Sequence, residues 1–144
     1  MWLTLWLWAA QPDVHHPPLP ARIEWAIEYS ESRGVATCRN GPTWGVWQVD
    51  HHYASHVTRR HPHLLFLPAI GRAEGRRMMH YWLRKSRGDM RRALAAYQCG
   101  YGGLSGKCGQ AYASTVLGRA KNAHWSVEYL ADHCQTCPEC CVED

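Results

Sequence analysis

The stretch IEYSESRG, from Ile27 to Gly34, carries an apolar helical pattern up to a carboxylate. Residues of one helix face recur at Ile23, Ala26, Ile27 and Ser30. Glu31 extends the row of Ile23 and Ile27 by a further step of four, and Gly34 is a plausible C-cap. The sequence therefore predicts a helix whose inward face ends at an acidic side chain.

Three glutamates fall in this helix, and we expect different roles for them. Glu24 and Glu28 are predicted to be solvated charges. Glu31 continues the apolar row and lies in the last turn, where the negative end of the helix dipole disfavours a carboxylate. Partial burial and this dipole should both raise the pKa of Glu31. A carboxyl that stays protonated near neutral pH is what a general acid requires.

The length and charge of the chain restrict its class. A chain of 144 residues with 46% hydrophobic content can bury one sizeable core, so one domain is expected. The formal net charge of +4 suits an anionic surface such as a cell wall, phospholipid or nucleic acid. No run of basic residues resembles a nucleic-acid-binding arm, because Arg76-Arg77 and Arg91-Arg92 fall in helical segments, where solvated faces are expected. We expect a monomer that binds no nucleic acid.

The two ends of the chain differ from its middle. Residues 2–10 are apolar and rich in Trp, which is consistent with an atypical export signal or with a helix that packs on the domain or on a membrane surface through Trp2 to Trp8. A proline-rich linker then runs to residue 20. We assign residues 21–125 to the main domain and residues 126–144 to a C-terminal helix with a Cys-rich tail.

Seven cysteines in so short a chain indicate an oxidising compartment and disulfides. Cys99 and Cys108 bracket a Gly-rich loop and are our first choice of pair. The four tail cysteines could instead hold zinc, although structural zinc sites usually take their ligand pairs from separated segments. Five histidines lie in residues 50–63, which we interpret as an exposed loop or helix. No metal and no cofactor are expected.

The remaining pattern is mainly helical. Residues 75–85 form one predicted helix, and Asp89 is a suitable N-cap for the next. Further helices are expected at residues 111–121 and 126–134. Residues 41–50 suggest turns or a short strand ending at Gln48, so any β element should be small and lie near residues 43–49.

Four short motifs resemble, in order and spacing, those of the soluble lytic transglycosylase family of the lysozyme superfamily. They are Glu31-Ser32, Gly45-Val46-Trp47-Gln48, Ala95-Ala96-Tyr97-Gln98-Cys99-Gly100, and Tyr112 with Val116. The resemblance covers about residues 21–120 and implies a lysozyme-like α-helical domain. Two departures concern the sugar-binding wall: Trp47 stands where the family usually has Met, and Gln98-Cys99 replaces Asn-Ala.

The resemblance also implies roles for particular residues. Glu31 would be the catalytic acid, supported by Ser32 beside it. Gln48 would bind the substrate or hold the floor of the cleft, and Tyr97 would lie across from Glu31. The implied substrate-binding set is Ser32, Trp47, Gln48, Tyr97, Gln98 and Tyr101. Trp44 is a further possible sugar platform, although large aromatic residues more often belong to the core.

The acidic residues of the sequence indicate which reaction to expect. Most glycosidases use two carboxylates, but no Asp or Glu lies between Glu31 and Gln48, and Thr43 occupies the position where similar animal lysozymes have an acid. A single acid can suffice if the N-acetyl group of the substrate stabilises the positive centre. In the resembled family the 6-hydroxyl of muramic acid then closes a 1,6-anhydro ring.

Two other functions remain open at this stage. Asp50 could activate water if it faces the cleft, which would make the protein a hydrolytic muramidase of goose or phage type. The domain could also be a non-catalytic glycan-binding or assembly component of a secretion system, an envelope complex or a virion. In each case the expected partner is the glycan strand of peptidoglycan, and the expected location is the periplasm, the cell envelope or a phage particle.

Overall fold

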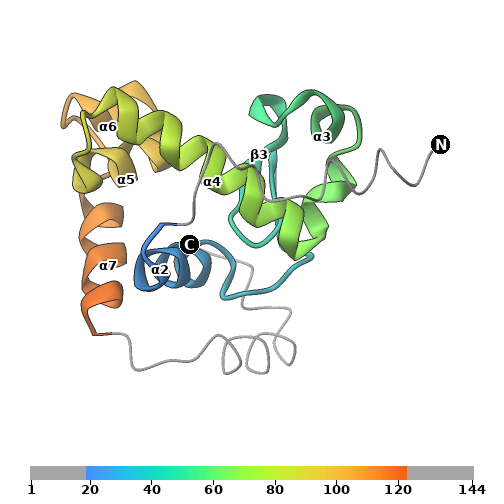
Figure 1. The fold of residues 1–144 in the computed structure, drawn as a ribbon, viewed down its shortest axis with the longest axis horizontal. Helices are drawn as coiled ribbons and strands as arrows, with labels where there is room; N and C mark the ends of the chain where they lie inside the picture. Colours follow the sequence, from blue (N-terminus) through green and yellow to red (C-terminus); the bar gives the residue numbers. More distant parts are fainter. Residues whose placement is uncertain (1–18, 123–144) are drawn as a thin grey trace.

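The computed structural model describes residues 19–122, which form a mainly helical domain with a small antiparallel sheet (Figure 1). The helical elements are α2 (Ala21–Ser32), η1 (His51–Tyr53), α3 (His56–Arg60), η2 (Pro62–Phe66), α4 (Pro68–Lys85), α5 (Met90–Cys99), α6 (Tyr101–Leu104) and α7 (Gln110–Lys121). The strands are β1 (Arg39–Asn40), β2 (Thr43–Trp44) and β3 (Val49–Asp50). The predicted fold class, mainly α with a small β element, is confirmed. Predictions for residues 1–18 and 123–144 lie outside the described residues.

Helix α2 forms where the apolar spacing predicts it, and it ends one residue before the predicted cap. Arg33 adopts the left-handed conformation at φ 52°, and its N–H donates to the Tyr29 carbonyl. Gly34 follows with φ 82°. The end of the helix is thus formed by two consecutive left-handed residues, and Glu31 lies in its last turn.

The sheet is a three-stranded meander in the order β1-β2-β3. Thr43 pairs with Asp50, and Trp44 pairs with Val49. The sequence predicted that Gln48 ends a strand, and this is wrong. Gln48 occupies the turn between β2 and β3 with φ 47°. This left-handed backbone is uncommon for a residue with a side chain and marks a position where the surroundings fix the conformation.

Helix α4 begins at Pro68, seven residues before the predicted start, because proline suits the first turn of a helix. It crosses the domain between the sheet and the helices α5 to α7 (Figure 1). Gly75 allows this close packing, since a Cβ there would lie 2.3 Å from the Trp47 ring. Trp47, Ile27, Leu65, Met79 and Leu94 are the largest apolar side chains of the fully buried core.

Helices α5, α6 and α7 form the other end of the domain (Figure 1). The predicted N-cap is confirmed, because the Asp89 carboxylate accepts from the N–H of Arg92 at 3.1 Å. The predicted disulfide is also present and joins Cys99 at the end of α5 to Cys108 before α7. Between them lies α6, so the Gly-rich segment expected as a loop contains a short helix.

The prediction that Glu24 and Glu28 are solvated charges is wrong. Arg72 of α4 donates to both carboxylate oxygens of Glu28, at 2.8 and 2.7 Å, and Glu28 is only 8% exposed. Arg76 makes the same kind of paired contact with Glu24. The prediction of a solvated Arg76 is therefore wrong as well, since α4 places its arginines against the acidic side of α2.

Among the helices of residues 19–122, none has both the length and the apolar character needed to cross a bilayer.

Candidate functional site

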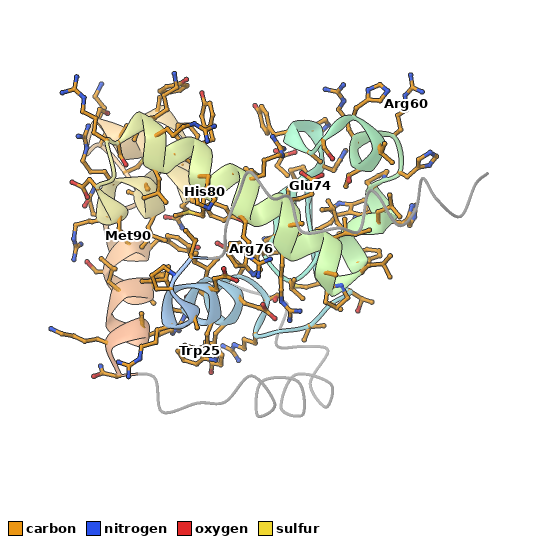
Figure 2. All side chains as sticks on the ribbon, viewed as in Figure 1. Trp25, Arg60, Glu74, Arg76, His80 and Met90 are labelled. Carbon is orange, nitrogen blue, oxygen red and sulfur yellow. A yellow bond between two sulfur atoms is a disulfide. The ribbon has the colours of Figure 1, made fainter. Side chains whose placement is uncertain are left out.

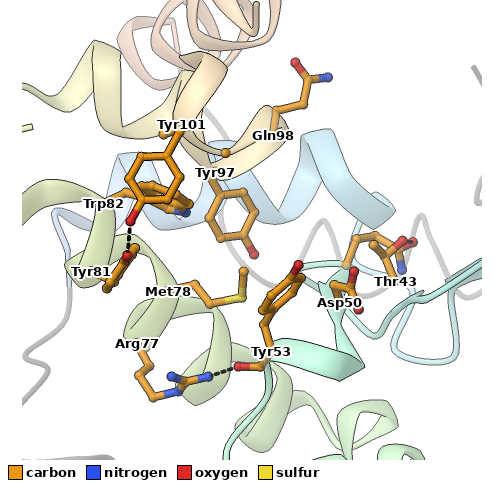
Figure 3. A pocket seen from close by; sticks show the side chains of 13 residues that line it. Thr43, Asp50, Tyr53, Arg77, Met78, Tyr81, Trp82, Tyr97, Gln98 and Tyr101 are labelled. Atoms are coloured by element: carbon orange, nitrogen blue, oxygen red, sulfur yellow. Dashed lines mark hydrogen bonds between the residues drawn. The ribbon is translucent and has the colours of Figure 1, made fainter. Parts of the chain in front are cut away.

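A cleft of about 530 Å³ separates the sheet from the helical end of the domain (Figure 3). One side is formed by the sheet and η1, and the other by α4, the end of α5 and the start of α6. The lining residues named by the sequence predictions are Gln48, Asp50, Tyr97, Gln98 and Tyr101. Segments far apart in the sequence therefore meet at this cleft.

Gln48 holds the loop that forms the sheet side of the cleft. Its side-chain amide N–H group donates to the carbonyls of Cys38 and Gly45, at 3.0 and 2.9 Å. Its side-chain oxygen accepts from the Thr43 hydroxyl at 3.0 Å. These contacts explain how the left-handed backbone of Gln48 is kept, and they favour the predicted role in the cleft floor over direct binding of a ligand.

Asp50 also lines the cleft, which was the open question raised by the sequence. Its carboxylate accepts from the backbone N–H of His52 at 3.0 Å, and it lies 2.8 Å from Nδ1 of the same histidine. The side chain keeps 27% of its surface exposed. Asp50 is therefore the one carboxylate among the residues that line the cleft, on the opposite side from the aromatic wall.

The aromatic wall consists of Tyr81, Trp82 and Tyr101. The hydroxyls of Tyr81 and Tyr101 lie 2.7 Å apart, and Trp82 packs edge to face against both rings (Figure 3). Tyr101 is 62% exposed, so it presents a ring to solvent as predicted. Rings that are fixed by each other and open on one side are suited to stacking against a flat apolar face of a ligand.

Tyr97 forms the inner part of the cleft and links its two sides. Its hydroxyl donates to the Trp47 carbonyl at 2.7 Å, which ties α5 to the sheet loop. Desolvation by burial, with a contribution from the nearby Glu31, raises the pKa of Tyr97 well above its ordinary value. This phenol therefore stays neutral.

Glu31 lies in the last turn of α2, keeps part of its surface exposed, and is not one of the residues that line the cavity. Its carboxylate Oε1 accepts a short hydrogen bond from the Tyr112 hydroxyl, which α7 supplies. Desolvation by burial raises the pKa of Glu31 to about 7, although the bond from Tyr112 acts in the opposite direction. The predicted rise in pKa is confirmed, and burial is its dominant cause.

Tyr112 is held neutral by the same surroundings. Desolvation is the largest cause that raises its pKa well above the ordinary value, and the charge of Glu31 adds to it. The phenol is therefore available as a hydrogen-bond donor to Glu31 at any pH at which the domain functions. Arg119 lies over the Tyr29 ring and donates to Ser30, so its charge is engaged beside this site without contacting the Glu31 carboxylate.

Ser32 fixes the end of α2 relative to the sheet loop. Its hydroxyl contacts the Val46 carbonyl at 2.6 Å and the Glu28 carbonyl at 3.2 Å, and it accepts from the Gly34 N–H at 3.1 Å. The side chain is buried, so it does not reach a ligand. The predicted supporting role of Ser32 fits this position, whereas its assignment to the substrate-binding set does not.

The assignment of Trp47 to the sugar-binding wall is also wrong. Trp47 has no exposed surface, and its indole N–H donates to the Glu28 carboxylate at 3.2 Å. Trp44 is 6% exposed and stacks on Phe66, with the Arg39 guanidinium over its ring. Both tryptophans are core residues, and Gly75 of α4 leaves room for the ring of Trp47.

Gln98 lies at the rim of the cleft, on the exposed side of α5. Its side chain extends away from Tyr97 and Asp50 (Figure 3). The sequence motif thus brings Tyr97 into the site, while its neighbour Gln98 points outward from it.

Several residues of the site were not predicted from the sequence, namely Tyr53, Arg77, Met78, Tyr81, Trp82 and the partner of Glu31, Tyr112. Met78 and Trp82 pack against the core and also line the cleft. The spacing of Met78, Tyr81 and Trp82 places them on one face of a helix, but this face was not distinguished from the core-facing one. Tyr112 carried part of the resemblance, yet nothing in the sequence indicated its contact with Glu31.

Arg77 was expected on a solvated face and instead joins the cleft to η1. Its guanidinium donates to Glu74 at 3.0 Å and makes a short contact with the Tyr53 carbonyl (Figure 3). Glu74 in turn accepts from the Ser55 N–H at the start of α3. This buried carboxylate therefore positions the part of the sheet side that carries Tyr53.

Within residues 19–122, no group of three His, Cys, Asp or Glu side chains is arranged to bind a metal ion. Comparisons of the chain with family models, curated proteins and solved structures gave no match.

Proposed function

We propose that this protein is a peptidoglycan lytic transglycosylase that cleaves the bond between N-acetylmuramic acid and N-acetylglucosamine, with Glu31 as its acid. The observation that carries the proposal is the buried carboxyl of Glu31, whose pKa of about 7 keeps a large fraction protonated at neutral pH. The charge of Glu31 contributes to the raised pKa of Tyr97, and Tyr97 lines the cleft between the sheet and the helices. A lysozyme-like arrangement of the fold belongs to the same proposal.

The chemistry requires one group to act in two steps. Glu31 donates its proton to the glycosidic oxygen, the bond to the anomeric carbon breaks, and the N-acetyl oxygen of the muramic residue attacks that carbon. The resulting carboxylate of Glu31 then removes the proton of the 6-hydroxyl, whose oxygen displaces the N-acetyl oxygen and closes the anhydro ring. No water is consumed. A pKa near the working pH suits both steps.

The neighbours of Glu31 support this use of one carboxyl. The Tyr112 hydroxyl stabilises the carboxylate form through its hydrogen bond, while burial favours the neutral form. The two effects act in opposite directions, and together they leave the pKa of Glu31 at about 7. Tyr97 fixes α5 to the sheet loop, and Ser32 fixes the end of α2 to the same loop. The position of the Glu31 carboxyl relative to the cleft is therefore held constant.

A hydrolytic muramidase is the second candidate, and the position of Asp50 favours it. This carboxylate lines the cleft and is partly exposed, so it could act as the base that directs water to the anomeric carbon. In that reaction Glu31 would remain the acid. The two candidates therefore differ in the nucleophile, which is the 6-hydroxyl in transglycosylation and water in hydrolysis, and in whether Asp50 is needed.

Digestion of purified peptidoglycan followed by mass spectrometry of the soluble fragments tests the proposal. Anhydromuramic products from the unsubstituted protein, retained in Asp50→Asn and lost in Glu31→Gln, would support transglycosylation. Products heavier by one water that disappear in Asp50→Asn would assign hydrolysis instead. If no fragments are released by folded protein, the enzymatic proposal is wrong and a binding role replaces it.

A further inference from the structure

The charges of the chain are strongly separated along its length. All sixteen Lys and Arg residues fall within residues 19–122, together with only six of the twelve Asp and Glu residues. The described domain therefore carries a much larger positive charge than the +4 of the whole chain. A surplus of positive charge of this size destabilises a compact domain through self-repulsion. The place where the cations lie on the surface can therefore indicate a binding partner.

The six acidic side chains of the domain are engaged internally. The partners are Arg76 for Glu24, Arg72 for Glu28, Arg77 for Glu74, Tyr112 for Glu31, His52 for Asp50 and the N-terminus of α5 for Asp89. Three of these six acids neutralise arginines on the inner side of α4. The remaining cations are thus not balanced by carboxylates of the described residues.

Six of these cations gather at the end of the domain where α4 turns into α5. This basic end consists of Arg84, Lys85, Arg87, Arg91, Arg92 and Lys107, and all six are exposed. None of them takes part in an ion pair within residues 19–122. The guanidinium of Arg92 donates to the Leu104 carbonyl at 2.7 Å, which brings the end of α6 into the same surface.

The basic end is continuous with the aromatic wall of the cleft. The Lys85 ammonium lies 5.6 Å from the centre of the Tyr81 ring, and the charge of Arg84 acts on the Tyr81 hydroxyl. Tyr81 and Tyr101 line the cleft, and α6 runs from Tyr101 to the carbonyl held by Arg92. A polymer leaving the cleft along this wall would therefore pass over the cations.

Arg87 shows that the charge is kept at some cost in stability. It has φ 55° and precedes Gly88 at φ 83°, so it occupies a left-handed position where glycine is normally favoured. Its side chain is exposed. Glycine at this position would relieve the backbone and remove one charge, which provides a substitution that should not impair folding.

From this arrangement we infer that the basic end recognises the carboxylates of the stem peptides carried by the glycan strand. The inference rests on the proposed function, because that function places the strand in the cleft. Each unmodified disaccharide bears a peptide with free carboxylates, which is a regularly repeated negative charge along the polymer. Guanidinium groups bind carboxylates through paired hydrogen bonds, and four of the six cations are arginines. Peptide-bearing strands are therefore preferred over bare glycan.

Binding to fluorescent glycan strands tests the inference. The strands are compared in three forms: with intact stem peptides, with peptides whose carboxylates have been amidated, and with peptides removed. All proteins carry Glu31→Gln so that the strands are not consumed. The variant Lys85→Gln/Arg87→Gly is compared with Arg59→Gln/Arg60→Gln, which removes two exposed charges from α3. The labelled Arg60 and Met90 show that α3 and the start of α5 lie at opposite ends of the domain (Figure 2).

The expected result is a loss of about fivefold in affinity for intact strands in Lys85→Gln/Arg87→Gly, since two exposed charge contacts are removed. Affinity for amidated and stripped strands should stay unchanged, as should the affinity of the α3 control for all three forms. An equal loss on amidated or stripped strands, or an equal loss in the α3 control, would overturn the inference. Cleavage of the three strand forms by the unsubstituted protein is measured in a separate assay. A failure of the proposed function is therefore distinguished from a failure of the binding inference.

Discussion

Glu28 and Glu31 belong to the same helix and lie three residues apart, yet their surroundings are opposite. Glu28 faces α4, where Arg72 contacts both of its oxygens. Glu31 faces α7 and α5, which bring two tyrosines and no cation to its carboxyl. The comparison shows that the partner helix, and not the helix that carries the glutamate, decides whether the carboxyl is paired with a cation or has a raised pKa.

The two environments have different consequences for the fold. A buried carboxylate with a paired guanidinium contributes to stability as long as both partners are present. A buried carboxyl without a cation opposes stability in its charged form and is therefore unusual unless it has a function. The α2–α4 contact is thus structural, while the α2–α7 contact holds the carboxyl that we propose as the catalytic acid.

The largest expected effect is the loss of activity in Glu31→Gln. Removal of the only proton donor should lower the rate of glycan cleavage by at least the ~10² to 10⁴ attributed to general acid–base catalysis, and by more if one carboxyl serves both steps. The measurement is the release of soluble muropeptides over time. Glutamine keeps the size of the side chain, so circular dichroism should show a folded protein. Cleavage at an unchanged rate would remove Glu31 from the mechanism.

The next effect concerns stability at the α2–α4 contact. Arg72→Met leaves the Glu28 carboxylate buried without its cation, which should lower the free energy of unfolding by about 3 kcal/mol. Urea denaturation without reductant measures this change. In the double variant Glu28→Gln/Arg72→Met the loss should be smaller than the sum of the two single losses, because the two residues interact. Additive losses would mean that the ion pair contributes nothing.

Urea denaturation of Glu31→Gln should show an increase in the free energy of unfolding, opposite in sign to the change in Arg72→Met, and the increase should depend on pH. The folded-state pKa of Glu31 is raised to about 7, so the folded protein binds the proton more tightly than the unfolded chain. The stability contributed by this protonation is present at low pH and is lost as pH rises from the unfolded pKa through 7. Glu31→Gln should therefore be more stable than the unsubstituted protein at pH 8, by about 3 kcal/mol, and nearly equal to it at pH 4.

A constant difference across this pH range, or a variant that is less stable at pH 8, would contradict the assignment of an unpaired buried carboxyl. Glu28→Gln provides the matched comparison. It changes the same residue type on the same helix, and it should destabilise the domain at pH 8, because Arg72 loses its carboxylate.

The smallest expected effect comes from Tyr112→Phe. This change removes the hydrogen bond that favours the charged form of Glu31, so the pKa of the carboxyl should rise further. Cleavage that requires the protonated acid declines as pH rises through about 7, and the variant should move this decline to higher pH. The pH profile of kcat/KM gives the result, with an expected loss of about tenfold at the optimum. An unchanged profile would show that Tyr112 does not set the pKa.

The sequence was informative wherever local patterning determines structure. The apolar spacing of α2, the N-cap Asp89 and the bracketing of a short segment by Cys99 and Cys108 were each sufficient for a correct prediction. Placing Glu31 at the end of an inward-facing row also predicted its raised pKa. These features depend on residues that are close together in the chain.

The errors have a common cause, which is that long-range partners are not visible in a single helix pattern. The burial of Glu24 and Glu28 depends on arginines more than forty positions later, and the burial of Trp47 depends on Gly75. Likewise, the aromatic wall arises only where α4 meets α6. Patterns along one element could not separate the face of α4 that lines the cleft from the face that packs in the core.

The measurement that tests the central claim most directly is the titration of the Glu31 carboxyl by carbon NMR, with Glu31→Gln used to assign its signal. The structure predicts a midpoint near pH 7, caused by burial beside Tyr97 and Tyr112. A midpoint near the ordinary value of a solvated glutamate would contradict the account, because the carboxyl would then be ionised at neutral pH and would have no proton to donate.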